Sequence, residues 1–273
     1  MVRSGRQWPI HLLLGLGAFV MVVPFLWQVI TSLKTVSESR AVPPTLWPTA
    51  PTLAGFERFF DTVPFWSMFA VSTAVLIIRV VGQLAICALA AYAFARIPFP
   101  GRGFFFGLFL VMLMAPSQLF LISQFQLMRD LQLLDTIPAI AIPGIFSAFG
   151  TFLLRQAFFG IPREYEEAAR LDGANSWQIF GRVMLPMTRP TLAALTVLTA
   201  LYSWNDLLWP LITTSSRENM TLPVGLANLQ GQYATEYPSL MAGALVVSLP
   251  LVLVFLALQR QFFEGIASSG LKG

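Results

Sequence analysis

The residues whose types and spacing favour contact with a polar partner lie in one interval, residues 160–190, GIPREYEEAARLDGANSWQIFGRVMLPMTRP. Carboxylates and guanidinium groups alternate along it, and an apolar stretch lies on either side. A charged insert between two membrane spans needs a partner outside the bilayer, because lipid offers nothing to pair with its charges. The polar members are Arg163, Glu164, Glu166, Glu167, Arg170, Asp172, Asn175, Arg182 and Arg189.

Local signals predict a first short helix in this interval. Pro162 suits the first turn of a helix, and the glutamates that follow it are favoured near the positive N-terminal end. The helix is expected to end near Leu171, because Asp172-Gly173 is a turn signal. Small residues at Ala168, Ala169, Gly173 and Ala174 let another surface approach closely, and the carboxylates of Glu167 and Asp172 can meet basic groups on a partner.

A second helix is predicted from about Trp177 to Leu185. Asn175 or Ser176 can cap it, and Pro186 is expected to stop it. Its apolar stripe is expected to pack on the chain's own spans, with members at Trp177, Phe180 and Met184. The interval is thus predicted to be a helix–turn–helix hairpin at the cytoplasmic surface. The competing interpretation is an amphipathic surface helix without a partner.

Residues for covalent or metal chemistry are almost absent. The chain has one histidine, His11, and one cysteine, Cys87, so no histidine- or cysteine-based catalytic or metal site can be assembled. It has no G-x-x-x-x-G-K-[ST] phosphate loop, and neither Lys34 nor Lys272 follows a glycine. We therefore predict no catalytic residue, metal or cofactor in this chain. The net charge of +4 is dispersed and does not indicate nucleic-acid binding.

Composition indicates that lipid is the solvent for most of the chain. The 273 residues are 56% hydrophobic and 11% charged, against about 25% charged in soluble domains. Spans of this length in lipid are helices, because every backbone polar group must be satisfied internally. The prediction is an all-α integral membrane protein with one domain, residues 1–273, and the hairpin between its fourth and fifth spans. The six predicted spans are about 10–30, 66–95, 103–123, 137–159, 190–212 and 239–263.

Orientation follows from the distribution of lysine and arginine. With the N-terminus in the cytoplasm, eleven of these residues fall inside and five outside, so both termini are predicted to be cytoplasmic. Arg79 lies within the second span and belongs to neither set. The first apolar run is longer than a usual signal peptide and is expected to be retained as a span.

Few ionisable residues lie inside the spans, which argues against an autonomous ion-driven carrier. Arg79 is expected to snorkel or to pair with another chain rather than to bind substrate. Asp206 has two interpretations, an interfacial residue that pairs with a neighbour or a hydrogen-bond acceptor for substrate. With Asn205, these residues are the candidates for a translocation pathway.

Prolines and polar loops leave further alternatives open. Pro116, Pro138 and Pro143 break the third and fourth spans, either for packing or to line a path. The proline-rich segment 31–65 is either a surface linker or a structured cap that contacts an external partner. The loop 213–238 is polar enough to reach a substrate or a docked partner, through Gln230, Gly231, Gln232, Tyr233 and Thr235.

Several motifs together resemble the permeases of bacterial binding-protein-dependent ABC importers. The EAA loop of that family is matched by Glu167-Ala168-Ala169, Asp172-Gly173-Ala174, Phe180, Leu185-Pro186 and Pro190. Its carbohydrate branch, and the maltose-type second permease in particular, is resembled by Ala91 to Arg96, Phe99-Pro100-Gly101, Trp204-Asn205-Asp206, Thr221 to Leu226 and the tail from Gln259 to Gly273. Val71-Ser72 departs from the Asn-Ser expected in many relatives.

The resemblance implies the type I ABC importer permease fold in a bacterial inner membrane. It implies four partners besides the bilayer: a second homologous permease, two ATP-binding cassette subunits that hold ATP and Mg, and an extracytoplasmic sugar-binding protein. It implies contact with the ATPases through Glu166, Glu167, Ala168, Ala169, Asp172, Gly173 and Ala174, and through the tail residues Gly270, Leu271, Lys272 and Gly273. The hairpin is anchored by Trp177, Phe180, Met184, Leu185 and Pro186, and Gln232 and Tyr233 form the tip that enters the binding protein.

The leading hypothesis is a permease subunit of an ATP-driven, binding-protein-dependent sugar importer, not an enzyme. Within the same class, the alternative solute is glycerol phosphate or another polyol or phosphorylated compound. From other classes, the alternatives are an ion-driven secondary carrier and a membrane scaffold whose hairpin only binds a partner.

Overall fold

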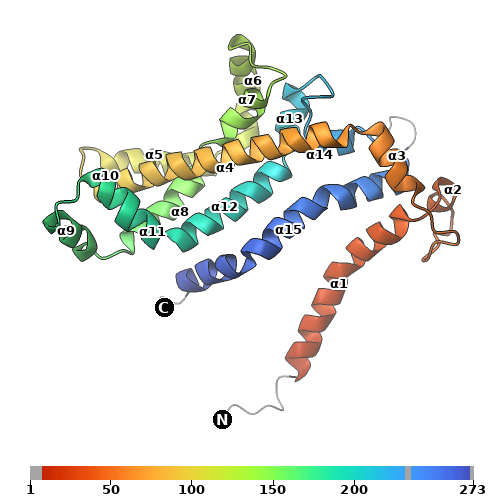
Figure 1. The fold of residues 1–273 in the computed structure, drawn as a ribbon, viewed down its shortest axis with the longest axis horizontal. Helices are drawn as coiled ribbons and strands as arrows, with labels where there is room; N and C mark the ends of the chain where they lie inside the picture. The colour runs from red at the N-terminus through yellow and green to blue at the C-terminus, as the bar shows by residue number, and fades with distance from the viewer. Residues whose placement is uncertain (1–7, 231–234, 271–273) are drawn as a thin grey trace. The chain divides into compact units, whose positions relative to one another are not determined.

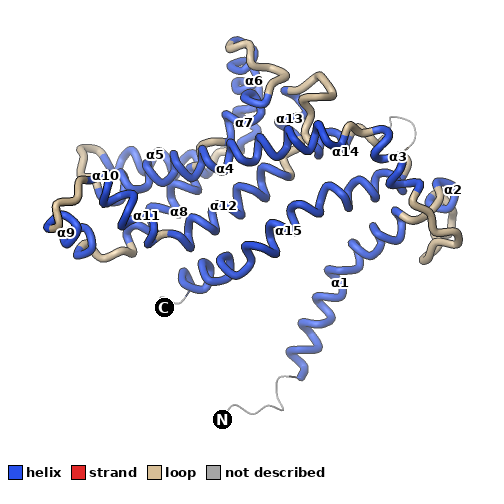
Figure 2. The backbone as a smooth tube through the Cα atoms, in the orientation of Figure 1, coloured by secondary structure: helices blue, strands red, loops and turns tan. Residues whose placement is uncertain are grey.

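The computed structural model describes residues 8–230 and 235–270, and beyond residue 253 it describes side chains only at 255, 256 and 259. All regular elements in these ranges are helices, as the ribbon and tube views show (Figures 1 and 2). Contacts group the chain into two compact units. One unit lies within Met1–Phe65 and Gly225–Pro250, and the other within Trp66–Val224 and Leu251–Gly273.

The first unit contains α1 (Trp8–Ser32), α2 (Val36–Ser39), α3 (Ala54–Thr62) and the first half of α15 (Tyr237–Gly270). Phe59 of α3 is fully buried in this unit. A Cβ atom added at Gly243 of α15 would lie 2.5 Å from the Phe59 ring, so only glycine lets the two helices approach this closely. An ion pair of 2.6 Å between Arg58 and Glu236 lies at the edge of the same contact.

The proline-rich segment after α1 has defined internal hydrogen bonds, as the structured interpretation of this segment requires. The backbone N–H of Thr52 donates to the Leu33 carbonyl at 2.9 Å. Glu38 accepts from the Thr49 backbone N–H at 2.8 Å and from the Thr45 hydroxyl at 3.0 Å. The bond from Thr49 is the main reason that the pKa of Glu38 lies below its usual value. Whether this segment contacts a partner stays a prediction.

The second unit begins with α4 (Phe65–Arg96), the longest helix in it. The helices that follow are α5 (Arg102–Met114), α6 (Leu121–Asp130), α7 (Ile137–Ala141), α8 (Ala148–Phe159), α9 (Glu164–Leu171), α10 (Ser176–Gln178), α11 (Leu185–Met187), α12 (Arg189–Trp204) and α13 (Leu208–Thr213). The residues of α14 (Leu222–Ala227) are divided between the two units after Val224. Two 3-10 turns, Ser117–Phe120 and Ile142–Gly144, and a π-helical segment, Ile179–Met184, connect some of them.

Several predicted spans are bent rather than continuous. By length and composition α1 and α4 are each able to cross a membrane, and up to five such spans are found in the described residues if each bent pair counts as one. The bend after α5 measures 97°, next to Pro116, so the stretch 115–123 does not continue that helix. The bend between Gly144 and α8 measures 44°. Pro138, by contrast, lies in the first turn of α7 and does not interrupt it. The count of six spans stays a prediction.

The core of the second unit joins α4, α8, α12 and the π-helical segment. Its buried members include Tyr92, Phe158, Ile179, Met184 and Leu195. Glycines allow this packing, because a Cβ atom at Gly150 would lie 3.1 Å from Leu195 and 3.2 Å from Cys87. Cys87 is fully buried in this core, where it serves as a small packing residue.

A matched pair of glycine substitutions tests this packing. A Cβ atom at Gly82 of α4 would lie 2.9 Å from the Ile145 Cβ, whereas one at Gly107 of α5 meets nothing within 4 Å. We expect Gly82→Val to cost about 1–3 kcal/mol through overpacking and to lower the melting temperature in detergent by several degrees. Gly107→Val makes the same change in helix propensity and should leave the melting temperature unchanged. Equal melting temperatures for the two variants would contradict the assigned contact.

Candidate functional sites

The interval 160–190 starts with α9, which carries three glutamates in its first turn. The helix ends at Asp172, and the backbone N–H of Ala174 donates to the Ala169 carbonyl at 2.9 Å. Gly173 has a φ of +82° in this turn, and no atom lies within 4 Å of a Cβ built there. The positive φ alone therefore favours glycine, which agrees with the turn predicted at Asp172-Gly173.

The second half of the interval begins with a capping box. Asn175 accepts from the Gln178 backbone N–H at 2.9 Å, and the Gln178 side chain accepts from the Asn175 backbone N–H at 2.8 Å. Of the two predicted caps, the structure therefore uses Asn175. Pro186 does not stop the helix as predicted, because it lies in the first turn of α11, where its missing N–H is tolerated. The chain turns only afterwards, with a 76° bend into α12.

The predicted anchor stripe is partly wrong. Met184 is fully buried, and Phe180 packs on Tyr92 with ring centroids 5.1 Å apart. Trp177 is 74% exposed and contacts Phe180 only at a ring edge. Ile179 is buried in its place. The reason is the π-helical segment Ile179–Met184, whose wider turn shifts the buried face away from the i, i+3, i+7 positions of an α-helix. Leu185 is partly buried against the same core.

Glu166 and Glu167 are neighbours with opposite environments. The Glu166 carboxylate lies 2.9 Å from Arg96 Nε at the end of α4, and the two side chains are 9% and 6% exposed. Arg96 also donates to the carbonyls of Phe158, at 2.5 Å, and Ile161. Glu166 is therefore held inside the chain and not available to a partner, which corrects its placement among the partner-facing residues. Successive residues of an α-helix point about 100° apart, so the two neighbouring glutamates face different directions. This difference could have been predicted from the sequence.

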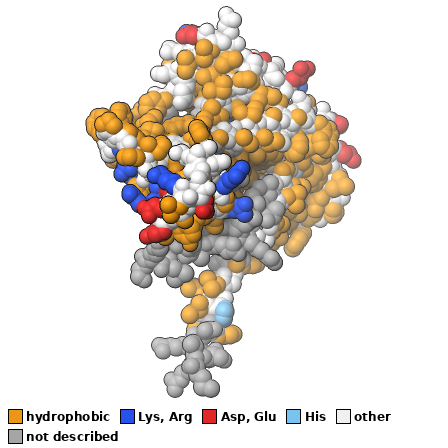
Figure 3. Space-filling view, turned by 60° about the vertical axis from the view of Figure 1, so that its left-hand side comes forward, with side chains coloured by type: hydrophobic (Ala, Val, Ile, Leu, Met, Phe, Trp, Pro, Cys, Tyr) orange, Lys and Arg blue, Asp and Glu red, His pale blue; other side chains and the backbone are white. Residues whose placement is uncertain are grey.

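The remaining predicted contact residues form an exposed surface, which we call the α9 surface. It comprises Glu167, Ala168, Asp172 and Gly173, while Ala169 and Ala174 are half-buried against the core of the second unit. In Figure 3, which brings the α9 end of Figure 1 forward, acidic and basic side chains mix on the near face beside largely hydrophobic flanks. A surface with small side chains at its centre and carboxylates around them suits close contact with a basic groove.

The second cluster of predicted residues joins α4 to the break between α12 and α13. Arg79 Nη1 lies 2.9 Å from the Asp206 carboxylate, and the side chains are only 3% and 11% exposed. Arg79 Nη2 donates to the Ile140 carbonyl at 2.8 Å. Arg79 thus pairs within its own chain, which corrects the expectation that it snorkels or meets another chain. The sequence predicted one continuous fifth span, and this pairing was not expected from it. In the structure α12 ends at Trp204, and Asp206 lies in the break that follows.

Two adjoining cavities of about 460 and 220 Å³ share Arg79, Pro143, Gly144 and Tyr202 in their linings. Other polar lining comes from Gln83, which accepts a hydrogen bond from Thr199, and from Gln118 and Gln124. Arg79 and Asp206 are the charged lining residues, so the charges cancel. Asn205 does not join this lining, and its side chain donates to the Leu201 carbonyl at 2.8 Å.

Gly144 fixes the position of the Arg79 side chain in these cavities. A Cβ atom at Gly144 would lie 2.6 Å from Arg79 Nε, so only glycine leaves room for the guanidinium. Trp209 of α13 reinforces the same junction by donating to the Ala139 carbonyl at 3.0 Å. Neither the Gly144 contact nor the Trp209 contact was predicted from the sequence, in which only Pro143 marked this stretch as a break.

Asp135 connects two loops outside the predicted spans through hydrogen bonds. Its carboxylate accepts from the backbone N–H groups of Ser215, at 2.9 Å, and Ser216, at 3.1 Å. Burial opposes ionisation of this group, but the hydrogen bonds outweigh it and hold the pKa of Asp135 below its usual value. The junction is therefore strongest above that usual value and weakens as the pH falls below it.

The remaining predicted residues lie near or beyond the described ranges. Gln230 is exposed, and the Thr235 carbonyl accepts from Arg40 at 3.3 Å. Gly231, Gln232 and Tyr233 lie outside the described residues, as do Leu271, Lys272 and Gly273. Gly270 is the last residue of α15. Among the described residues, no group of three or more histidine, cysteine or acidic side chains is placed to hold a metal ion.

Comparison with known proteins gives consistent relatives over nearly the whole chain. Residues 83–267 match the family described as binding-protein-dependent transport system inner membrane component. The chain is 38% identical to the arabinooligosaccharides transport system permease protein AraQ of Halalkalibacterium halodurans, over 94% of this chain and 93% of the relative. It is 31% identical to the sn-glycerol-3-phosphate transport system permease protein UgpE of Escherichia coli O1:K1, over 95% of each.

A solved structure agrees with these sequence relatives. A chain of a bacterial ABC transporter involved in the import of the acidic polysaccharide alginate matches with a TM-score of 0.80 and 27% identity. The match covers 96% of this chain and 99% of that one. The helical arrangement is therefore shared over nearly the full length of both chains.

The ion pair between Arg79 and Asp206 predicts an asymmetric response to substitution. Asp206→Asn leaves a buried arginine unpaired and should cost about 3–5 kcal/mol, whereas Arg79→Met with Asp206→Leu removes both charges and should cost far less. Thermal unfolding in detergent measures both variants. A double variant that is less stable than Asp206→Asn would contradict the pairing as the main constraint at this site.

The turn after α9 predicts a second asymmetry. Gly173→Asn should be tolerated, because asparagine adopts positive φ more readily than other side chains, while Gly173→Val should cost about 1–2 kcal/mol or more. Since no neighbour contacts this position, only backbone conformation distinguishes the two variants. Limited proteolysis at the turn checks the prediction, with faster cleavage expected for the valine variant alone.

Proposed function

This chain belongs to the family of binding-protein-dependent transport system inner membrane components, and on that premise we propose that it is a permease subunit of an ATP-driven sugar importer. It forms one half of the translocation pathway beside a second homologous permease. ATP and Mg are bound by two separate ATPase subunits, and a sugar-binding protein docks on the outer side. The chain crosses the bilayer six times with both termini in the cytoplasm.

The observation that supports the proposal is that one side of α9 is bound to the rest of the chain and the other side is exposed. Glu166 fastens the helix to the end of α4 through Arg96, and the α9 surface on the other side stays free for a partner. Beyond the turn, Met184 and Phe180 join the following segment to the core shared by α4 and α8. A displacement imposed on the α9 surface by an ATPase therefore reaches α4, α8 and α12 through buried contacts rather than through a loose loop.

The transported solute is proposed to be a neutral sugar. The relatives have names that point to both kinds of solute, neutral arabinooligosaccharides for AraQ and an anion for UgpE. In this chain the positive charge of Arg79 is cancelled by Asp206, so the two cavities carry no net charge for an anion. Amide and hydroxyl groups of Gln83, Thr199 and Tyr202, beside the aromatic ring of Phe149, suit the hydroxyl and C–H faces of a sugar.

An anionic solute is the second candidate, and it is favoured by the alginate importer whose fold this chain shares. In that case Arg79 exchanges Asp206 for the solute during transport. Uptake of a neutral and an anionic sugar by the unchanged chain discriminates the two candidates. Asp206→Asn exposes an uncompensated positive charge and should shift the preference toward the anion if these cavities line the pathway.

Charge reversal on α9 tests the proposed coupling. Glu167→Arg should lower sugar uptake at least about tenfold, because a like charge then faces the basic groove of the ATPase. Glu164→Arg makes the same change on the same helix, outside the α9 surface, and should retain uptake. Membrane amount and melting temperature of both variants should match the unchanged protein.

A third variant separates coupling from folding. Glu166→Gln weakens the tie to Arg96, so we expect a lower melting temperature for it and not for Glu167→Arg. Uptake that is unaffected by Glu167→Arg would remove the support for the α9 surface as the ATPase contact. Reconstitution with and without the ATPase and binding protein distinguishes the importer from an ion-driven carrier, which transports alone, and from a scaffold, which does not transport.

A further inference from the structure

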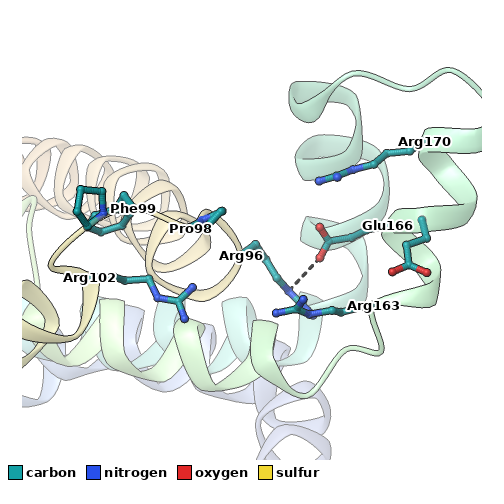
Figure 4. Close-up of a pocket in the computed structure, with 9 residues that line it drawn as sticks. Arg96, Pro98, Phe99, Arg102, Arg163, Glu166 and Arg170 are labelled. Carbon is teal, nitrogen blue, oxygen red and sulfur yellow. Dashed lines mark ion pairs between the residues drawn. The ribbon is translucent and has the colours of Figure 1, made fainter.

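A third cavity, at the α9 end, has no role in the function proposed above. It measures about 710 Å³ and lies between the turn that follows α4 and the inner side of α9 (Figure 4). Its lining includes four arginines, Arg96, Arg102, Arg163 and Arg170, and two glutamates, Glu166 and Glu167. The basic residues come from α4, α5, the segment before α9 and the last turn of α9, so segments far apart in the sequence converge here.

The charges of this lining do not cancel. Arg96 forms an ion pair with Glu166 and donates to two backbone carbonyls. Arg102, Arg163 and Arg170 make no ion pair with any residue that the structure describes, and Glu167 is the one acid left in the lining to offset them. Figure 4 shows the side chains of Arg102 and Arg170 directed from opposite sides toward the space beside the Arg96–Glu166 pair.

The surroundings favour an anion that belongs to a lipid. Ile97, Phe104 and Phe105 flank the lining residues in the chain and are 46%, 69% and 50% exposed. An apolar surface next to a basic cavity at the cytoplasmic end of membrane helices matches both parts of an acidic phospholipid, with the acyl chains outside and the phosphate within. The backbone N–H groups at the start of α5 add to the positive potential, since Gly101 provides no side-chain cap there.

We propose that this cavity binds a phosphate group, supplied by the headgroup of an acidic phospholipid or by a soluble phosphate. The phosphate oxygens accept hydrogen bonds from Arg102, Arg163 and Arg170, while Arg96 stays bound to Glu166. Because Arg102 starts α5 and Arg170 ends α9, a bound phosphate ties the two segments together across the cavity. Occupancy then makes the position of α9 depend on the lipid composition of the membrane.

The test uses the full chain purified in detergent and two triple variants of equal charge. The cavity variant is Arg102→Gln, Arg163→Gln and Arg170→Gln. The control variant is Arg182→Gln, Arg189→Gln and Arg217→Gln, whose arginines are exposed and lie outside the cavity lining. Native mass spectrometry measures retained phosphatidylglycerol against phosphatidylcholine, and melting temperatures are recorded in phosphatidylglycerol micelles and in inorganic phosphate.

The proposal expects at least about tenfold weaker retention of phosphatidylglycerol by the cavity variant, with the control variant like the unchanged protein. Stabilisation by phosphatidylglycerol but not by inorganic phosphate identifies the lipid as the source, and equal stabilisation by both identifies soluble phosphate. Equal losses in both variants, or no stabilisation by either phosphate, would overturn the proposal. So would a cavity variant that loses only ATPase association, since the occupant would then be protein.

Folding of the triple variant is controlled by two milder changes. Arg170→Gln alters one exposed side chain and should weaken retention by a smaller factor in the same direction. Arg102→Lys, Arg163→Lys and Arg170→Lys keep the charge and should restore part of the retention, because lysine still pairs with phosphate but loses the bidentate geometry. Unchanged retention in Arg170→Gln together with wild-type retention in the lysine variant would contradict the site.

Discussion

The arrangement at the α9 end of the second unit depends on one buried ion pair, between Arg96 at the end of α4 and Glu166 on α9. Two charges removed from water are stable only if further hydrogen bonds accompany the pair, and Arg96 adds two by donating to the carbonyls of Phe158, at the end of α8, and Ile161, just beyond it. This pair fixes which side of α9 faces inward. It therefore also fixes that Glu167 is exposed at the α9 surface and that three arginines lie around a cavity in which Glu167 is the one remaining acid.

A second buried ion pair lies nearer the start of α4. Arg79 is buried between Asp206 and a carbonyl of α7, and Gly144 leaves room for its guanidinium. In both places an arginine of α4 pairs with a carboxylate from one later segment and donates to a backbone carbonyl of another. The two pairs differ in consequence, because the first leaves a charged surface for proteins or lipids whereas the second leaves neutral cavities suited to a sugar.

Local features of the hairpin interval were predictable because their causes are local. The Asn175 cap and the Gly173 turn depend on residues within one or two turns of each other, and the structure shows both where the sequence placed them, although α9 begins at Glu164, after Pro162. The prediction that Trp177 belongs to the buried anchor stripe was wrong, because a π-helical turn changes the spacing of the residues that face the core. The pairing of Arg79 with Asp206 was beyond sequence reasoning, since it requires a break after Trp204 that no proline or glycine marks.

The separation of Arg79 and Asp206 by 127 residues has a consequence for the order of synthesis. An arginine near the centre of a membrane helix costs about 2.5–3.5 kcal/mol on insertion. At about 5–20 residues per second, α4 leaves the ribosome roughly 6–25 seconds before its partner carboxylate exists. Until α12 and α13 have been synthesised, the charge of Arg79 lacks the carboxylate that pairs with it in the finished structure.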